Sequence, residues 1–308
     1  MSTASTIPAD DPYPRKTASI AGRTMAYIDV GEGRSVVFLH GNPTSSYIWR
    51  NIIPHVAGRA RCIAPDLIGM GQSEKLPSSD DDAYSYAVHR RYLDELLETL
   101  TIGNGVVLVC QDWGSVLAFD WARRHPDRVG GLVHFEAIVT PFAWDEFPEA
   151  PGTQESARAW FEALRSTEGE RMILEENLFV ERRIPSRTLR EITEAEMQVY
   201  RQPYLTPGED RRPTLTWARQ VPISGEPAGV TEVVTSNAQW LRESDVPKVF
   251  IRAEPGGLIQ GERIAFCRSL PNTREVAVPG IHYVQEDSPE LIGKAVADLV
   301  HKLDRPSA

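Results

Sequence analysis

Residues 105–124 read GVVLVCQDWGSVLAFDWARR: an apolar run stops at Asp112, and apolar residues at helical spacing follow at once. The run 106–109 has the continuous, β-branched pattern of a strand that is covered on both faces of a sheet. Gly114 and Ser115 keep the turn small, and Pro126 ends the following helix. The pattern predicts a strand, a sharp turn and a helix, with the Asp112 side chain exposed at the turn. An Asp at this place can also simply cap the helix. Features elsewhere in the sequence have to decide whether Asp112 has a structural or a catalytic role.

The composition is that of a globular protein that does not bind nucleic acid. The chain has 308 residues, and 41% of them are hydrophobic, which is enough for a sizeable core. Its 33 basic and 43 acidic residues give a net charge of -10, which argues against a nucleic-acid or anionic-membrane partner. Cys62, Cys110 and Cys267 fit no disulfide or metal-ligand spacing, and no apolar run has the pattern of a signal peptide or a membrane span. We therefore expect a cytoplasmic protein without a membrane anchor.

Predicted strands and helices alternate through the first part of the chain. Apolar runs at 24–30, 36–39, 62–65 and 129–136 predict strands, and helical spacing predicts helices at 47–56 and 84–100 after a loose start. This alternation is typical of the α/β class, in which helices cover both faces of a mostly parallel sheet.

The pattern changes after Pro141. Charged amphipathic helices and a Pro-rich stretch follow to Pro222, and the strand pattern resumes only at 248–251 and 275–278, before a closing helix to Leu303. We therefore expect a main domain formed by 1–140 and 223–308, and a helical cap domain formed by 141–222. The segment 149–154 has the character of an insertion before the cap.

Residues whose side chains can take part in catalysis follow several predicted strands. His40 begins an HGNP loop after the strand 36–39, Glu136 ends the strand 129–136, Glu254 follows the next strand, and His282 follows the last one. In the α/β-hydrolase fold the catalytic residues follow one another along the chain in the order nucleophile, acid and His. Asp112 on the strand-to-helix turn and a His near the end of the chain match this order. The other six histidines, His40 among them, have no matching position and are interpreted as structural.

The segment 24–303 resembles the haloalkane dehalogenase family of the α/β-hydrolase superfamily. The likeness rests on five motifs: HGNPTSS from His40, DWGS from Asp112, FEA from Phe135, RRPTL from Arg211 and HYVQEDSP from His282. The resemblance implies an eight-stranded, mostly parallel sheet with an inserted helical cap.

The resemblance also implies a set of site residues. Asp112 is the implied nucleophile, His282 the general base and Glu136 its acid partner, with Glu254 as the second candidate for the acid. The side-chain N–H groups of Asn42 and Trp113 are implied to hold the departing halide.

The chemistry explains why these residue types are needed. An ionised carboxylate displaces a halide from saturated carbon without help from a base, whereas a Ser must first lose a proton. The resulting ester on Asp112 is hydrolysed by water that a neutral His282 activates, while backbone amides near Asn42 and Trp113 hold the oxyanion. The expected products are a primary alcohol, halide and a proton. Every required group is a side chain or a backbone amide, so no metal and no cofactor is expected.

Motif matches also suggest a pocket wall and some departures from the family. The wall is predicted to contain Phe147, Phe161, Phe179, Trp217, Val221, Leu258 and Tyr283. Arg183 and Arg187 stand where more apolar residues are expected, and Cys110 and Gln111 precede the nucleophile where many relatives have an apolar residue and His. The range of substrates therefore does not follow from the resemblance.

Two other enzyme classes share these landmarks. An epoxide hydrolase uses the same Asp nucleophile but needs cap tyrosines as proton donors, for which Tyr200 and Tyr204 are available. A coelenterazine luciferase of the same fold shares nearly all five motifs but needs a wider cavity.

We expect as partners a small haloalkane, water and a halide ion, and neither nucleic acid nor a membrane. We expect the protein to be a monomer or weak homodimer.

Overall fold

The computed structural model describes residues 7–77, 82–147 and 156–305, with an eight-stranded sheet at its centre. The strand order is β1-β2-β4-β3-β5-β6-β7-β8; β2 pairs antiparallel with β1 and β4, and all other neighbours pair in parallel. The predicted eight-stranded, mostly parallel sheet is therefore confirmed. The strands are Lys16–Ile20 (β1), Arg23–Val30 (β2), Ser35–Leu39 (β3), Arg61–Pro65 (β4), Val106–Asp112 (β5), Val129–Ala137 (β6), Lys248–Pro255 (β7) and Thr273–Gly280 (β8).

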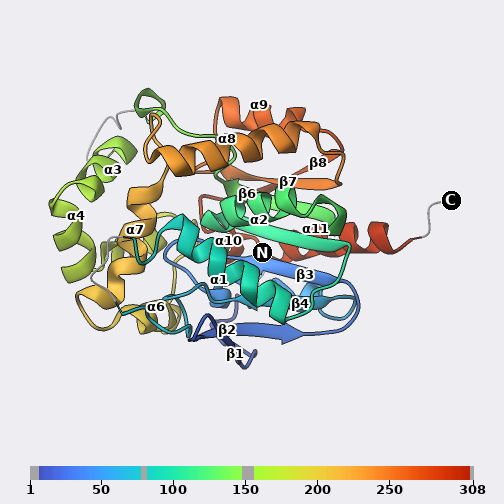
Figure 1. The fold of residues 1–308 in the computed structure, drawn as a ribbon, viewed down its shortest axis with the longest axis horizontal. Helices are drawn as coiled ribbons and strands as arrows, with labels where there is room; N and C mark the ends of the chain where they lie inside the picture. Colours follow the sequence, from blue (N-terminus) through green and yellow to red (C-terminus); the bar gives the residue numbers. More distant parts are fainter. Residues whose placement is uncertain (1–6, 78–81, 148–155, 306–308) are drawn as a thin grey trace, which may run out of the picture.

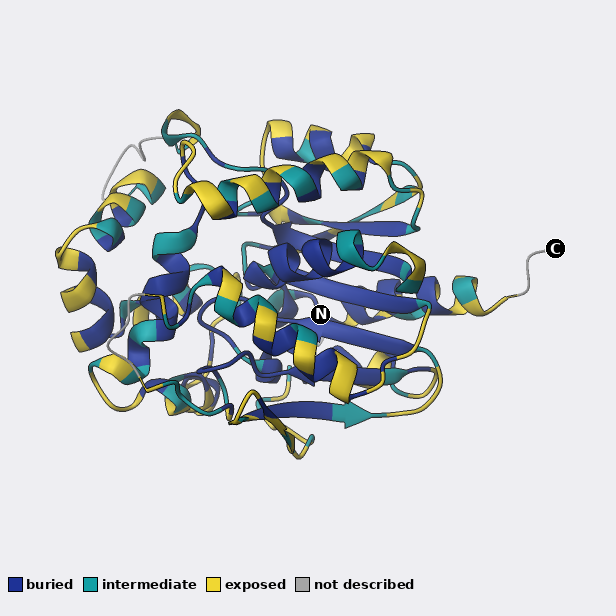
Figure 2. Cartoon of the chain, in the orientation of Figure 1, coloured by how far each residue is buried: buried dark blue, intermediate teal, exposed yellow. Residues whose placement is uncertain are grey.

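Helices cover the sheet on both faces. In Figure 1, α1, α2 and α8 lie in front of the strands and α11 runs behind them. Figure 2 shows the central strands buried, while the outward faces of α1 and α8 are exposed. The helices outside the segment between β6 and α8 are Tyr86–Thr99 (α1), Trp113–Arg124 (α2), Ala228–Glu243 (α8), Glu262–Ser269 (α9), Val284–Asp287 (α10) and Pro289–Asp304 (α11).

Two parts of the main body differ from the sequence prediction. The single helix predicted over 47–56 is wrong, because the chain instead forms two 3-10 turns, Ser46–Trp49 (η1) and Ile53–His55 (η2). Pro54 lacks the N–H that a continuous α-helix needs at this position. Strand β1 is missing from the prediction because its residues KTASI are mostly polar and exposed; pairing with β2 holds them extended.

The chain between β6 and α8 forms a separate group of short helices at the left of Figure 1. Two hydrogen bonds of 2.8 Å tie its ends together, from Phe142 N–H to the Pro222 carbonyl and from Ser224 N–H to the Phe142 carbonyl. These bonds lie next to the predicted boundaries, 140/141 and 222/223, which stay a prediction. The predicted insertion 149–154 lies outside the described residues. The helices of the group include Ala157–Arg165 (α3), Glu168–Glu170 (α4), Ile184–Ser186 (α5), Glu194–Arg201 (α6) and Arg212–Gln220 (α7), with π-helical turns at Arg171–Glu175 and Phe179–Arg183.

A buried ion network joins this group to the main body. Arg50, which follows η1, binds Glu286 of α10 at 2.6 Å and Glu196 of α6 at 2.7 Å. Arg190 contacts both carboxylates, and Tyr200 of α6 donates its hydroxyl to Glu286. Arg50, Glu196 and Glu286 are at most 1% exposed. A buried charge without a partner is very costly, so the network fixes α6 relative to α10.

The structure contains no helix within residues 7–77, 82–147 and 156–305 that is long and apolar enough to cross a membrane.

Candidate active site

Asp112 stands at the junction of β5 and α2 in a backbone conformation that ordinary residues rarely adopt. Its φ of 51° is positive, and the Ser115 hydroxyl holds the turn by donating to the Asp112 carbonyl at 2.5 Å. The turn also requires glycine at two neighbours. A Cβ at Gly114 would lie 2.0 Å from the Leu39 carbonyl oxygen, and one at Gly41 would lie 2.2 Å from the Asp112 carboxylate. The sequence therefore folds here into the predicted strand, sharp turn and helix.

The Asp112 carboxylate faces a cavity and is held by backbone amides. Asn42 N–H donates to its Oδ1 at 2.8 Å, and the Trp113 N–H also hydrogen-bonds to the carboxylate. Desolvation in the cavity raises the pKa of the Asp112 carboxyl, while His282 and these two amides act in the opposite direction. The turn thus presents a carboxylate with few charge-stabilising neighbours to whatever enters the cavity.

His282 lies between two carboxylates. Its Nε2 is 3.6 Å from Asp112 Oδ2, and its Nδ1 is 3.2 Å from Glu136 Oε2. Since an ionised carboxylate only accepts hydrogen bonds, Nδ1 carries the proton and Nε2 is left as an acceptor on the side of Asp112. Glu136 is 1% exposed and also accepts the backbone N–H groups of Gly257 and Leu258. It is Glu136, at the end of β6, that reaches His282.

Glu254, the second candidate for the acid, points elsewhere. Its side chain is 57% exposed and pairs with Arg252 at 2.6 Å on the surface. The two candidates end neighbouring parallel strands, so only the direction of each side chain separates them.

Gln111 contacts His282, a contact that was not predicted. Its Nε2 lies 3.0 Å from His282 Nε2 and 3.3 Å from the His282 carbonyl oxygen. With the proton on Nδ1, the Gln111 amide donates to the free lone pair of the ring. The only signal in the sequence is its position directly before Asp112.

Asn42 and Trp113, the predicted halide ligands, both line the cavity beside Asp112. One hydrogen of the Asn42 amide is donated to the Thr214 carbonyl at 2.9 Å, so one N–H remains for a ligand. The indole of Trp113 stacks on Trp217, with 4.3 Å between ring centroids. Tyr283 donates its hydroxyl to the Asn42 carbonyl at 3.2 Å and so fixes the loop from the other side.

The cavity has a volume of about 790 Å³ and lies between the sheet and the helices of the 141–222 segment. Its lining includes Asp112, His282 and six of the seven residues predicted for the wall: Phe147, Phe161, Phe179, Val221, Leu258 and Tyr283. Trp217 is the exception, and its prediction is corrected. It is completely buried, packed between Trp113 and His89, and its neighbour Ala218 faces the cavity instead.

Charged residues also line the cavity away from Asp112. Arg183, Arg187, Arg263, Glu146 and Glu262 are all part of the wall. Arg263 binds Glu146 at 2.9 Å, so these two charges neutralise each other. The two arginines at 183 and 187, which are departures from the family pattern, therefore lie in the cavity itself.

The cap tyrosines do not reach this cavity. Tyr200 is buried and donates its hydroxyl to Glu286, and Tyr204 is buried under Lys75. Neither is part of the lining. An epoxide hydrolase would need such hydroxyls next to the nucleophile, so this alternative lacks its proton donors.

His40 supports the loop in front of Asp112. Its Nε2 accepts the Leu67 N–H at 3.0 Å, and its Nδ1 donates to the Gly41 carbonyl at 2.9 Å. Burial lowers the pKa of His40, which keeps the ring neutral in this structural position.

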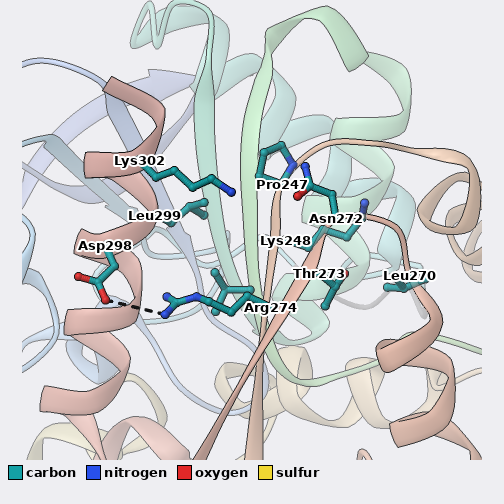
Figure 3. Close-up of a pocket in the computed structure, with 10 residues that line it drawn as sticks. Pro247, Lys248, Leu270, Asn272, Thr273, Arg274, Asp298, Leu299 and Lys302 are labelled. Atoms are coloured by element: carbon teal, nitrogen blue, oxygen red, sulfur yellow. Dashed lines mark ion pairs between the residues drawn. The ribbon is translucent and has the colours of Figure 1, made fainter. Parts of the chain in front are cut away.

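A second cavity of about 500 Å³ lies at the opposite end of the sheet, between the starts of β7 and β8 and helix α11 (Figure 3). The Lys248 ammonium donates to the carbonyls of Ser244, Val246 and Pro271, and Arg274 faces Asp298 at 3.9 Å. The charges of Lys248 and Arg274 are thus bound within the protein, and none of the residues around Asp112 takes part. Among the described residues no cluster of three or more His, Cys, Asp or Glu could hold a metal ion.

The chain matches known proteins over most of its length. A model of the α/β hydrolase fold matches residues 34–289. Haloalkane dehalogenases of Sphingobium indicum and Mycolicibacterium smegmatis are 53% and 49% identical to it, covering 95% and 96% of this chain and 97% and 94% of the relatives. The crystal structure of haloalkane dehalogenase DbeA from Bradyrhizobium elkani superimposes with a TM-score of 0.87 at 42% identity, over 94% of this chain and 98% of that one.

The fold, and the sharp turn between β5 and α2 that carries Asp112, therefore define an α/β hydrolase with an Asp in the place of the nucleophile. Within that class, the chain belongs to the haloalkane dehalogenase family.

Proposed function

We propose that this protein hydrolyses haloalkanes to a primary alcohol, halide and a proton through an ester on Asp112. The observation that carries the proposal is the Asp112 carboxylate on the floor of a largely apolar cavity, with Asn42 and Trp113 on one side and His282 on the other. The family membership supports the same reaction.

The first step is displacement at saturated carbon. An oxygen of Asp112 attacks the carbon that bears the halogen, the carbon–halogen bond breaks, and the halide leaves with the bonding pair. The halide is held by the remaining N–H of Asn42 and the indole N–H of Trp113, which as donors favour the charge that develops in the transition state.

The second step is hydrolysis of the ester. His282 Nε2 takes a proton from water, the oxygen attacks the carboxyl carbon of Asp112, and the alkyl oxygen leaves as the alcohol. The backbone amides of Asn42 and Trp113, which already bind the carboxylate, stabilise the oxyanion. Glu136 keeps the ring in the productive tautomer and stabilises the imidazolium. Water has to replace the Gln111 amide at Nε2 for this step.

The test separates the two steps. His282→Phe leaves the nucleophile in place but removes the base, so incubation with 1-bromobutane should give one equivalent of bromide and a stable mass increase of one butyl group. Intact mass spectrometry and peptide mapping should locate the group on Asp112. Asp112→Asn is the control and should give neither product.

An unmodified His282→Phe protein together with a wild type that releases no halide from any chloro-, bromo- or iodoalkane would overturn the proposal. Light from coelenterazine without halide release would instead identify a luciferase, the second class that shares these motifs.

The finer assignments of partner and location complete the proposal. The reaction needs a halogenated alkane and water and no cofactor. We place the protein in the cytoplasm as a monomer or weak homodimer, which fractionation of cells and light scattering of the purified protein can test.

A further inference from the structure

One cation of the cavity wall has no partner among the residues that the structure describes. Arg187 lines the cavity and is half-buried, and its guanidinium makes no hydrogen bond or ion pair with residues 7–77, 82–147 or 156–305. A guanidinium offers five N–H donors in a fixed fork that matches a carboxylate. An unpaired fork that faces the same cavity as the nucleophile is therefore a feature that a substrate can use.

The position of Arg187 is fixed by its backbone. Its carbonyl accepts the N–H groups of His282 and Tyr283, at 3.0 and 3.2 Å. The Arg187 N–H in turn donates to the Arg183 carbonyl at 3.0 Å. The side chain is therefore carried by the same hydrogen-bonded segment that positions the general base.

The surroundings of the other charged residues in the wall make Arg187 the group to which an anionic ligand would bind. Arg263 and Glu146 pair with each other, and Arg183 lies over the ring of Trp160, 4.5 Å from its centroid. Glu262 is exposed at the start of α9, on the side of the main body. Both Arg183 and Arg187 act to lower the pKa of the buried Tyr283 hydroxyl, against its desolvation and the charge of Asp112, so the two guanidiniums act on the same part of the cavity.

We infer that Arg187 binds an anionic group at the far end of the substrate, so that ω-haloalkanoates are preferred over uncharged haloalkanes of equal length. The inference rests on the proposed function of the same site. The halogen would lie at Asn42 and Trp113, the alkyl chain along the aromatic wall, and the carboxylate at the Arg187 guanidinium. The reaction is unchanged: the carbon–halogen bond breaks, and the carboxylate takes no covalent part.

The negative charge on Asp112 determines which alkyl chain lengths of the substrate should react well. A haloacetate would bring its own carboxylate next to the nucleophile, and two like charges about 4 Å apart repel strongly in a partly desolvated cavity. Longer chains separate them. Bromoacetate should therefore be a poor substrate, whereas 6-bromohexanoate should be a good one.

The experiment compares 6-bromohexanoate with its methyl ester, which has the same reacting carbon and chain but no charge. In the wild type, kcat/KM should be higher for the carboxylate. Arg187→Leu should lower the carboxylate-to-ester ratio about tenfold, the size expected for a half-exposed charge-assisted hydrogen bond. Arg187→Lys, which keeps the charge, should retain much of the preference. A matched control is Arg182→Leu on the same segment, an exposed arginine outside the cavity lining, which should leave the ratio unchanged.

The dependence on salt is a second readout that a purely structural role would not move. Raising the ionic strength with sodium perchlorate should reduce the ratio in the wild type and not in Arg187→Leu, because salt screens the charge interaction. Equal ratios in wild type and Arg187→Leu would overturn the inference. So would an equal loss for both substrates, which would indicate that Arg187 helps halide leave. If neither compound nor 1-bromobutane released halide, the proposed function itself would have failed.

Discussion

At the scale of single residues, Asp112 meets two opposing requirements. In the proposed reaction it must be anionic to attack carbon, yet it faces a cavity whose desolvation raises the pKa of its carboxyl. Two backbone amides and His282 offset part of that effect, and the charge of Glu136 adds to it. A carboxylate that water solvates poorly is a stronger nucleophile than a free one, so the same desolvation that raises the pKa serves the attack.

This pKa shift predicts a loss of alkylation on the acid side. As the pH falls through the raised pKa, Asp112 becomes protonated and cannot attack, so the rate should fall at a pH above the value of about 3.9 for a free Asp. The rate of butyl-adduct formation in His282→Phe, measured by quenched-flow mass spectrometry, isolates this step from hydrolysis of the ester. Adding Glu136→Gln should move the acid limb to lower pH, because a negative charge is removed. A rate that stays constant down to pH 4 in both proteins would contradict the assignment.

At the scale of elements, the site depends on how closely α2 approaches β3. The carbonyl oxygen of Leu39 lies only 2.0 Å from where a Cβ of residue 114 would be, so the start of α2 touches the end of β3 through a glycine. That approach brings the backbone amides of Asn42 and Trp113 to the same carboxylate.

Gly114→Ala should therefore damage both stability and chemistry. The new methyl group would meet backbone at 2.0 Å, and relieving the overlap requires α2 to move. We expect a loss of about 2–3 kcal/mol of unfolding free energy, measured by urea titration, and loss of adduct formation. Gly229→Ala on α8 is the matched control, because nothing lies within 4 Å of its added Cβ. It should leave adduct formation intact and, if anything, increase stability. Normal adduct formation in Gly114→Ala would show that the close approach is unnecessary.

Much of this element-level arrangement could be predicted from the sequence. The parallel strands are continuous apolar runs, and the carboxyl ends of parallel strands meet at one edge, which is where Asp112, Glu136 and His282 come together. The polar edge strand β1 has no such signal.

What could not be predicted depends on side-chain direction and on contacts between distant segments. Trp217 and Ala218 are neighbours on α7, and only the packing of that helix decides which of them faces the cavity. The contact of Gln111 with His282 and the bonds from Arg187 to the same loop join residues 171 and 95 positions apart, beyond the reach of local pattern.

At the scale of the whole molecule, the helices over the cavity are fixed in place by the network around Arg50. Two buried carboxylates from two different parts of the chain share this guanidinium. Such a network contributes little to stability compared with an apolar core of the same size, but removing one member leaves charges unpaired.

Arg50→Leu should accordingly destabilise the fold by about 3 kcal/mol, less than the full cost of two orphan charges because Arg190 still contacts both carboxylates. Urea unfolding measures the change. Arg171→Leu removes an arginine that is 49% exposed and pairs with Glu168 and Glu176 at the surface, and it should cost less than about 1 kcal/mol. Equal effects of the two substitutions would mean that the buried network does not fix the helices.

The hydrogen bonds of Phe142 with Pro222 and Ser224 bear on how the substrate range of such an enzyme can change. The segment 141–222 leaves the main body and returns to it at one place. A change in the length of this segment therefore does not require β6 or β7 to move. Changes in this segment can therefore alter one side of the cavity, where Arg183 and Arg187 lie, while Asp112, Glu136 and His282 keep their positions. The preference for one substrate over another can thus be altered separately from the groups placed to carry out the reaction.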